Sequence, residues 1–257
     1  MLGEVAASPF GARLRQWRTH RGVSQLALAT KVGSTPRHVS FLETGRSRPS
    51  RQMVLRLGEA LGVPLRERNL LLHAAGLAGV YPEADVRGPD LTPYRAAVDG
   101  LLRAHLPYPA MVLDGRWNVL LANQACAHLY GADPTGVNIA RQMLTDPAAR
   151  QLIVNWPEVA AAGLDRLRRQ RGHAPFDAEL AALVDLAETA LAGLPRGQAA
   201  SSEPIVYPWF RVGERVVKTV GMVARFEPTT DVTLDELRVE LMYPADAEAD
   251  DYFRALA

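Results

Sequence analysis

The side chains with the most evident chemistry lie in a short polar stretch between residues 35 and 48. Arg37, Ser40 and Thr44 are spaced so that they share one face of a helix. An arginine near the start of a helix in the major groove can bond guanine O6 and N7 together, which is worth about 1–3 kcal/mol of discrimination. Arg37 is therefore the expected base reader. The alternative is that it contacts only phosphate, since phosphate and sugar take more than half of protein–DNA hydrogen bonds.

Two short helices joined by a turn must position this face. Ser24 can cap the first helix, and Gly33 lies where the chain must turn. Thr35 is the expected N-cap of the second helix, with Pro36 at its first position, where a missing N–H costs nothing. A helix-turn-helix that reads DNA has this arrangement. The side chains expected to point inward are Leu28, Ala29, Val32, Val39 and Leu42.

A resemblance to a known family covers about residues 8–76. The helix-turn-helix domain of phage-repressor-like and Xre-type transcription regulators is similar at Ser24-Gln25, Ala29, Gly33 and Leu42-Glu43-x-Gly45. The string from Arg37 to Gly76 resembles one subgroup, the regulators with an MmyB-like C-terminal ligand-binding domain. The resemblance implies double-stranded DNA as a partner. It also implies that Gln25, at a helix N-terminus, positions the DNA backbone.

Further positive side chains follow the second helix. Arg46 and Arg48 are expected over the neighbouring phosphates, whereas Glu43 is expected to be structural and to bond the following turn. The complete set of expected DNA contacts is Gln25, Thr35, Arg37, His38, Ser40, Thr44, Arg46 and Arg48.

The charge distribution agrees with a nucleic-acid-binding N-terminal part. Residues 1–80 contain 12 Lys+Arg and 4 Asp+Glu, a balance of +8. The remaining residues balance at −7, so the whole chain is nearly neutral at +1. A basic module on an acidic remainder is typical of a nucleic-acid reader with a separate control domain. The alternative is that this charge asymmetry between the two parts of the chain arose by chance.

The number of cysteines and the length of the apolar runs indicate the cellular compartment expected for the protein. Cys126 is the single cysteine, so no intramolecular disulfide can form and a reducing cytoplasm is expected. A buried, inert thiol is the expected state of Cys126. The chain has no uninterrupted apolar run of about 18 residues, so no membrane span is expected.

The hydrophobic period divides the chain into two domains. Residues 1–80 show five amphipathic helical stretches, which predicts a compact all-α domain. Residues 81–92 are rich in proline, glycine and acids and form the expected linker. Residues 93–257 form the second domain, which begins with a helix at Pro93.

In the second domain the pattern alternates between strands and helices. Residues 111–113 and 117–121 are expected to pair as strands around an Asp114-Gly115 turn, and Asn123 is expected to cap a helix over 124–130. Helices are expected near 138–144, 146–155, 157–170 and 176–192, and strands over 205–212, 215–226 and 237–243. The predicted fold is an α+β, PAS-like domain with an antiparallel sheet of about five strands.

The second domain also resembles the MmyB-like ligand-binding domain, through VLDGRWNVLLANQACAHLYG and DVTLDELRVELMYPAD. The resemblance implies a PAS-like fold that binds a fatty-acyl ligand. Such a chain needs an apolar slot and an anchor for its carboxylate. Arg150 is the favoured anchor, with Asn155 and Arg211 as the other candidates. The candidate wall residues are Trp117, Leu121, Met143, Trp156, Phe210 and Met222, with ordinary core packing as the alternative for each.

Three function classes remain. Common catalytic motifs are absent from the sequence, and no metal or other cofactor is expected beyond a bound fatty acid, so an enzyme is disfavoured. A ligand-responsive DNA-binding regulator is favoured. A constitutive regulator whose C-terminal domain only dimerises or recruits a partner is the alternative. A homodimer is expected, because one helix-turn-helix reads only a half-site.

Overall fold

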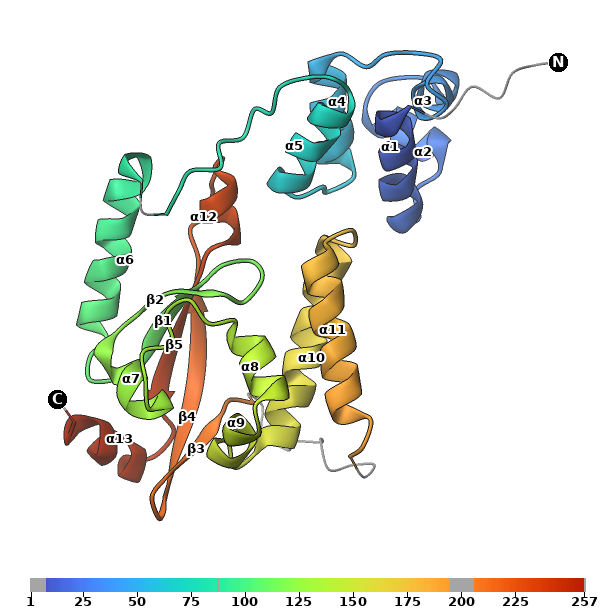
Figure 1. Ribbon diagram of the computed structural model, residues 1–257. Helices are drawn as coiled ribbons and strands as arrows, with labels where there is room; N and C mark the ends of the chain where they lie inside the picture. Colours follow the sequence, from blue (N-terminus) through green and yellow to red (C-terminus); the bar gives the residue numbers. More distant parts are fainter. Residues whose placement is uncertain (1–7, 87, 195–205, 257) are drawn as a thin grey trace. The chain divides into compact units, whose positions relative to one another are not determined.

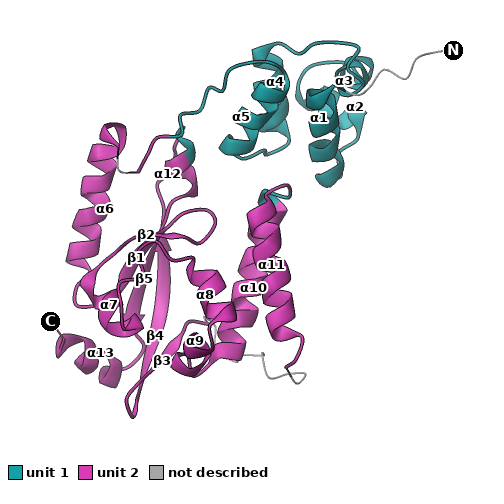
Figure 2. Cartoon of the chain, viewed as in Figure 1, with its two compact units in different colours: residues 1–83, 173–175, 230–232 teal, residues 84–172, 176–229, 233–257 magenta. Residues whose placement is uncertain are grey.

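The computed structural model describes residues 8–86, 88–194 and 206–256, which form two compact units (Figure 2). The first unit comprises residues 1–83, 173–175 and 230–232, and the second comprises residues 84–172, 176–229 and 233–257. The expected start of a strand at residue 205 lies outside the described residues.

The described part of the first unit is helical, as predicted. Its helices are α1 (Pro9–His20), α2 (Gln25–Lys31), α3 (Pro36–Glu43), α4 (Arg51–Ala60) and α5 (Leu65–Ala74). Ser24 and Thr35 cap α2 and α3 by accepting hydrogen bonds from the backbone N–H groups of Ala27 and His38, each at 3.1 Å. The five inward positions predicted for α2, α3 and the turn are all buried. They pack with Phe10, Leu14, Trp17, Val54, Leu57, Leu61, Val63, Leu71 and Leu72.

Helix α1 crosses the end of α3 at Gly11. A Cβ atom on Gly11 would lie 2.6 Å from the carbonyl oxygen of Leu42 and also too close to that of Glu43. These are backbone atoms, so they cannot move aside without shifting the helix. Glycine at this position therefore sets how closely α1 and α3 approach.

The second unit is built on a five-stranded sheet in the order β2-β1-β5-β4-β3, with every neighbouring pair antiparallel. The strands are β1 (Ala110–Leu113), β2 (Val119–Ala122), β3 (Trp209–Val212), β4 (Arg215–Ala224) and β5 (Arg238–Pro244). Strand β5 pairs Glu240 with Met111 of β1 and with Val223 of β4. The described elements confirm the predicted fold class, an all-α helix-turn-helix unit followed by an α+β unit.

Helices cover both faces of the sheet (Figure 1). On one face, Val98 and Leu102 of α6 pack against Val112, Val239 and Leu241. On the opposite face lie α8, α9 and α10. The helical elements of this unit are η1 (Pro89–Leu91), α6 (Thr92–Ala104), α7 (Gln124–Tyr130), α8 (Ile139–Thr145), α9 (Pro147–Leu152), α10 (Trp156–His173), α11 (Ala178–Leu191), α12 (Val232–Glu236) and α13 (Ala247–Arg254). None of the helices in the described residues is long and apolar enough to cross a membrane.

Two local predictions were wrong. The second strand begins at Val119 and not at Trp117, because the backbone of Trp117 has a φ of 72°, which is incompatible with a strand. Asn123 precedes α7 but its side chain makes no cap hydrogen bond. It instead accepts from the N–H of Ala110 and donates to the carbonyl oxygen of Tyr108, so it ties β1 to the end of the preceding loop.

We predict that Gly11→Ala lowers the stability of the first unit by about 1–3 kcal/mol, because the added methyl group has no room. Gly100→Ala is the matched control, since a Cβ at this position of α6 meets no atom of the described residues within 4 Å. It should raise stability by about 0.5–1 kcal/mol. Hydrogen exchange of the amides in α3 and α6 measures both effects. A change of the same sign in both variants would contradict the packing argument.

Candidate functional site

Helix α3 presents a polar, solvent-facing side. Val39 and Leu42 are buried, whereas Arg37 and Thr44 are exposed and Ser40 is half-buried. This is the arrangement predicted for a helix that reads base edges.

An aromatic ring on the same helix holds two of the exposed arginines. The guanidinium carbon of Arg37 lies 5.2 Å from the centroid of the Phe41 ring, and that of Arg46 lies 5.9 Å from it. Both contacts are within cation–π range. No role was predicted for Phe41, although its spacing of four residues from Arg37 is a signal for such a contact.

A buried ion pair lies behind α3. Glu43 is only 5% exposed and accepts hydrogen bonds from Arg18 Nε at 2.6 Å and Nη2 at 3.1 Å, and from Gln25 Nε2 at 2.8 Å. Hydrogen bonding to the carboxylate raises the pKa of Arg18 above its usual value. Glu43 is structural, as predicted, but these partners come from α1 and α2 and not from the following turn. The network therefore fixes α3 against the other two helices.

The other expected DNA contacts gather around α3. The hydroxyl of Thr35 caps the helix, and that of Thr44 donates to the carbonyl oxygen of Ser40 at 2.8 Å. His38 is half-buried, and Arg46 and Arg48 are exposed in the loop after α3. Gln25, expected to face phosphate, has its side-chain nitrogen bonded to Glu43. All eight residues thus lie at the start of α2, at the N-cap of α3, along α3 or just after it.

The second unit contains an apolar cavity of about 420 Å³. Its volume is within the range of small-molecule sites, about 300–1,000 Å³. The sheet supplies one wall and α8, α9 and α10 supply the other. The apolar lining includes Met111, Leu113, Ile139, Met143, Leu152, Ile153, Val159 and Met242.

Two of the predicted ligand residues, Trp117 and Met143, line this cavity. Leu121 does not, because it packs on the opposite face of the sheet, in the cluster under α6. Met222 does not either, because it projects from β4 and is 61% exposed. Alternation along a strand cannot by itself show which face meets the cavity.

Trp156 and Arg150 lie next to the cavity wall and not in it. Trp156 is buried and donates a hydrogen bond from Nε1 to the carbonyl oxygen of Met143 at 2.8 Å, so it holds the end of α8. Arg150 is exposed, and its guanidinium carbon lies 4.3 Å from the centroid of the Trp156 ring. This stacking explains the position of Arg150, which is not among the lining residues and so does not fit the role of anchor.

Asn155, Phe210 and Arg211 also take positions other than the predicted ones. The Asn155 side chain donates to the carbonyl oxygen of Tyr207 and accepts from the N–H of Trp209, so it fixes the segment that leads into β3. Phe210 is fully buried and packs edge-on against Tyr130. Arg211 is exposed on β3. Asn155 and Phe210 support the wall without lining it.

The cavity has one polar corner that the sequence analysis missed. Glu240 of β5 is 4% exposed and accepts hydrogen bonds from Arg166 of α10 and, at 2.7 Å, from the hydroxyl of Tyr207. Burial and the neighbouring carboxylate raise the pKa of Tyr207 well above its usual value. The Tyr207 ring lies against Gly221 of β4, where a Cβ would collide with it. All three polar residues line the cavity.

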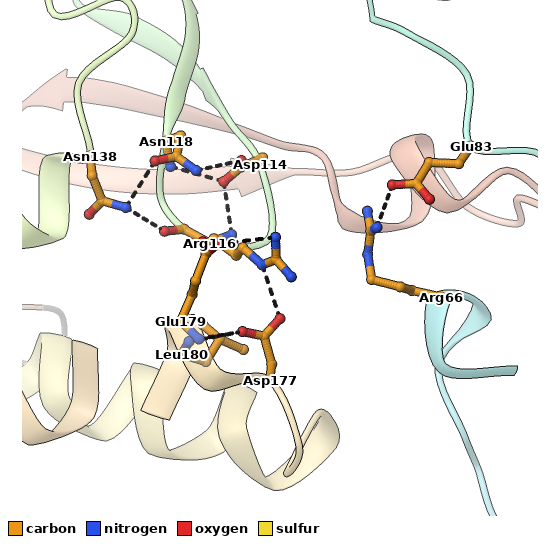
Figure 3. Close-up of polar contacts among 9 residues, drawn as sticks. All are labelled: Arg66, Glu83, Asp114, Arg116, Asn118, Asn138, Asp177, Glu179 and Leu180. Carbon is orange, nitrogen blue, oxygen red and sulfur yellow. Dashed lines mark hydrogen bonds and ion pairs between the residues drawn. The ribbon is translucent and has the colours of Figure 1, made fainter. Parts of the chain in front are cut away.

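Polar side chains connect the residues on either side of Trp117, which lines the cavity. Figure 3 shows these contacts around Asp114, Arg116, Asn118 and Asn138. Asp114 accepts hydrogen bonds from the backbone N–H groups of Arg116 and Asn118 at 2.8 and 2.9 Å. The side chain of Asn138 donates to the carbonyl oxygen of Arg116 at 2.8 Å. Arg116 in turn pairs with Asp177, which caps α11. This network supports the unusual backbone of Trp117, a conformation that costs energy for a large side chain.

We predict that Asp114→Ala lowers the free energy of unfolding by about 1–3 kcal/mol, because two backbone N–H groups lose their acceptor. Asp133→Ala is the control: Asp133 accepts hydrogen bonds from the backbone N–H and the hydroxyl of Thr135 but is exposed. Asp133→Ala should lower the free energy of unfolding by less than Asp114→Ala does. Urea unfolding of both variants measures the difference, and equal losses would refute a special role for the Asp114 turn.

Known protein families match both units. Residues 9–71 match a helix-turn-helix domain family, and residues 94–256 match the MmyB-like transcription regulator ligand binding domain. Both are families of transcription-regulator domains and neither is an enzyme family, in agreement with the sequence, which disfavours an enzyme.

Curated relatives match only part of the chain. Multiprotein-bridging factor 1 of Candida albicans and of Saccharomyces cerevisiae are each 38% identical to it over 60 residues, and human endothelial differentiation-related factor 1 is 32% identical. These matches cover 23% of the chain and 40% of each relative. The ligand-binding-domain match, in contrast, spans more than half of the chain. The chain therefore belongs to the family of transcription regulators with an MmyB-like ligand binding domain.

Proposed function

We propose that this regulator binds specific DNA sequences through α3 and that its second domain senses a small apolar ligand, a fatty acid or acyl compound. The observation that carries the proposal is the apolar cavity of about 420 Å³ in the domain that matches a ligand-binding family. A domain that served only to dimerise would not require such a cavity.

The DNA-binding part rests on the polar face of α3. Arg37 is exposed on this face and steadied by Phe41, which reduces the conformational entropy lost when it bonds a base. Gln25, Thr35, His38, Ser40, Thr44, Arg46 and Arg48 are the proposed supporting contacts, mostly to phosphate. Because one reading helix covers a half-site, the active form is proposed to be a homodimer. Such a protein acts on DNA in the cytoplasm.

The ligand acts only if it binds two states of the protein with different affinity. Filling the cavity would fix α8, α9 and α10 against the sheet, and this is the proposed difference between the states. Coupling between two sites is typically about 1–3 kcal/mol, or about 5–150-fold in DNA affinity.

We expect Arg37→Ala to flatten base preference at one operator position, because a bidentate base contact is lost. Arg46→Ala should weaken binding to all sequences and reduce the salt slope by about one unit, since it removes one phosphate contact. A binding-site selection and salt-dependent gel shifts measure the two effects. Unchanged base preference for the first variant, or an unchanged slope for the second, would refute the respective assignment.

We also expect dodecanoate to change the affinity of the wild-type chain for its operator by at least fivefold. Ala162→Phe should abolish this response and leave affinity without ligand unchanged, because the ring occupies the cavity that Ala162 lines. Ala161→Phe, on the same helix but not lining the cavity, is the control. Native mass spectrometry reports whether lipid binds. Operator affinity that never responds to bound lipid would favour a constitutive regulator.

A further inference from the structure

We propose that the polar corner of the cavity is a head-group site, in which Arg166 selects ligands with an anionic head and Glu240 sets the strength of that selection. The inference rests on the proposed function, because it assumes that an apolar ligand enters the cavity. It replaces Arg150, the anchor expected from the sequence, with a residue on a different helix.

Arg166 is placed to receive an anion. It is the one cationic side chain among the described residues that line the cavity. In the described part of the chain its only hydrogen bond goes to Glu240, and its guanidinium lies 4.6 Å from the centroid of the Trp117 ring. A guanidinium carries five N–H donors, so donors remain for a ligand carboxylate. The ring contact holds the guanidinium in place at the cavity.

Glu240 is poorly placed to receive a cation. Arg166 bonds Oε1 and Tyr207 bonds Oε2, and the positive charge of Arg166 already compensates that of the carboxylate. A second cation would therefore meet the repulsion of Arg166. Asp146 is the other carboxylate that lines the cavity. It accepts from the N–H of Ala148 at the start of α9, where the helix N-terminus compensates its charge.

A second buried arginine lies beside the polar corner, although it does not line the cavity. Arg238 lies on the same strand and face as Glu240, is 1% exposed, and its guanidinium carbon is 5.2 Å from the centroid of the Trp117 ring. Its Nε has no hydrogen-bond partner among the described residues. Its Nη2 donates to the carbonyl oxygen of Asp114 at 3.0 Å, and the carboxylates of Asp114 and Glu240 both lie near enough to act on its charge. Arg166 and Arg238 thus both lie against the Trp117 ring, next to Glu240.

In the same geometry, Glu240 opposes the binding of an acidic ligand. Its charge satisfies Arg166 when the cavity is empty and repels a ligand carboxylate when it is filled. Removing that charge while keeping an oxygen acceptor should therefore strengthen the binding of acids. A residue with a purely structural role would weaken binding when changed, so the sign of the effect separates the two roles.

The test compares dodecanoate, its methyl ester and dodecylamine on the full chain by isothermal titration calorimetry. The wild type should bind the acid about tenfold or more tightly than the ester, as expected for a charge-assisted hydrogen bond. Arg166→Gln should reduce acid affinity to that of the ester and leave ester affinity unchanged. Glu240→Gln should raise acid affinity severalfold. Arg169→Gln, an exposed position on the same helix, is the control and should match the wild type.

Four results would overturn the inference. Equal binding of acid and ester by the wild type, or tighter binding of the amine, would leave ligand sensing intact but remove the anionic head-group site. An equal loss of acid and ester affinity in Arg166→Gln would show that Arg166 only maintains the cavity. Failure of all three probes to bind the wild type would reject the proposed apolar-ligand function together with this inference.

Discussion

The buried carboxylate of Glu240 constrains much of the second unit. It lies on β5, the central strand, where an unpaired charge would cost several kcal/mol. Satisfying it requires Arg166 from α10 and Tyr207 from the segment before β3, so both must approach this face of the sheet. Tyr207 can do so only because Gly221 leaves room for its ring. The cavity is the apolar space that remains between these fixed polar contacts.

A buried ion pair is weak evidence for stability, because hydrophobic residues of the same volume often serve as well. Its presence in a largely apolar cavity agrees better with the proposed head-group site. The opposite face of the sheet supports this view: there Val112, Val239 and Leu241 pack against Val98 and Leu102 of α6. The same strand therefore has a purely apolar side where it packs and a charged side where it meets the cavity.

Local sequence patterns predicted most helices and strands. They could not predict contacts between residues that are far apart in the sequence. The helix over 124–130 and the caps at Ser24 and Thr35 are found as predicted, because each depends on residues within one turn. The anchor residue was not predictable in this way. Arg150 was favoured for its closeness in sequence to Trp156, and the two do stack, but behind the cavity wall. Arg166 and Glu240 are 74 residues apart, and only the fold brings them together.

The first unit limits how a bound ligand could act on DNA. Helix α3 is fixed by the Arg18–Glu43 pair and by the close approach of α1 at Gly11. Breaking a buried pair costs about 3–5 kcal/mol, which exceeds the roughly 1–3 kcal/mol typical of coupling between sites. A ligand therefore lacks the free energy to reshape the reading helix within its domain. In the proposed regulator, control must act on the placement of whole helix-turn-helix domains, and thus on the half-site spacing that a dimer can span.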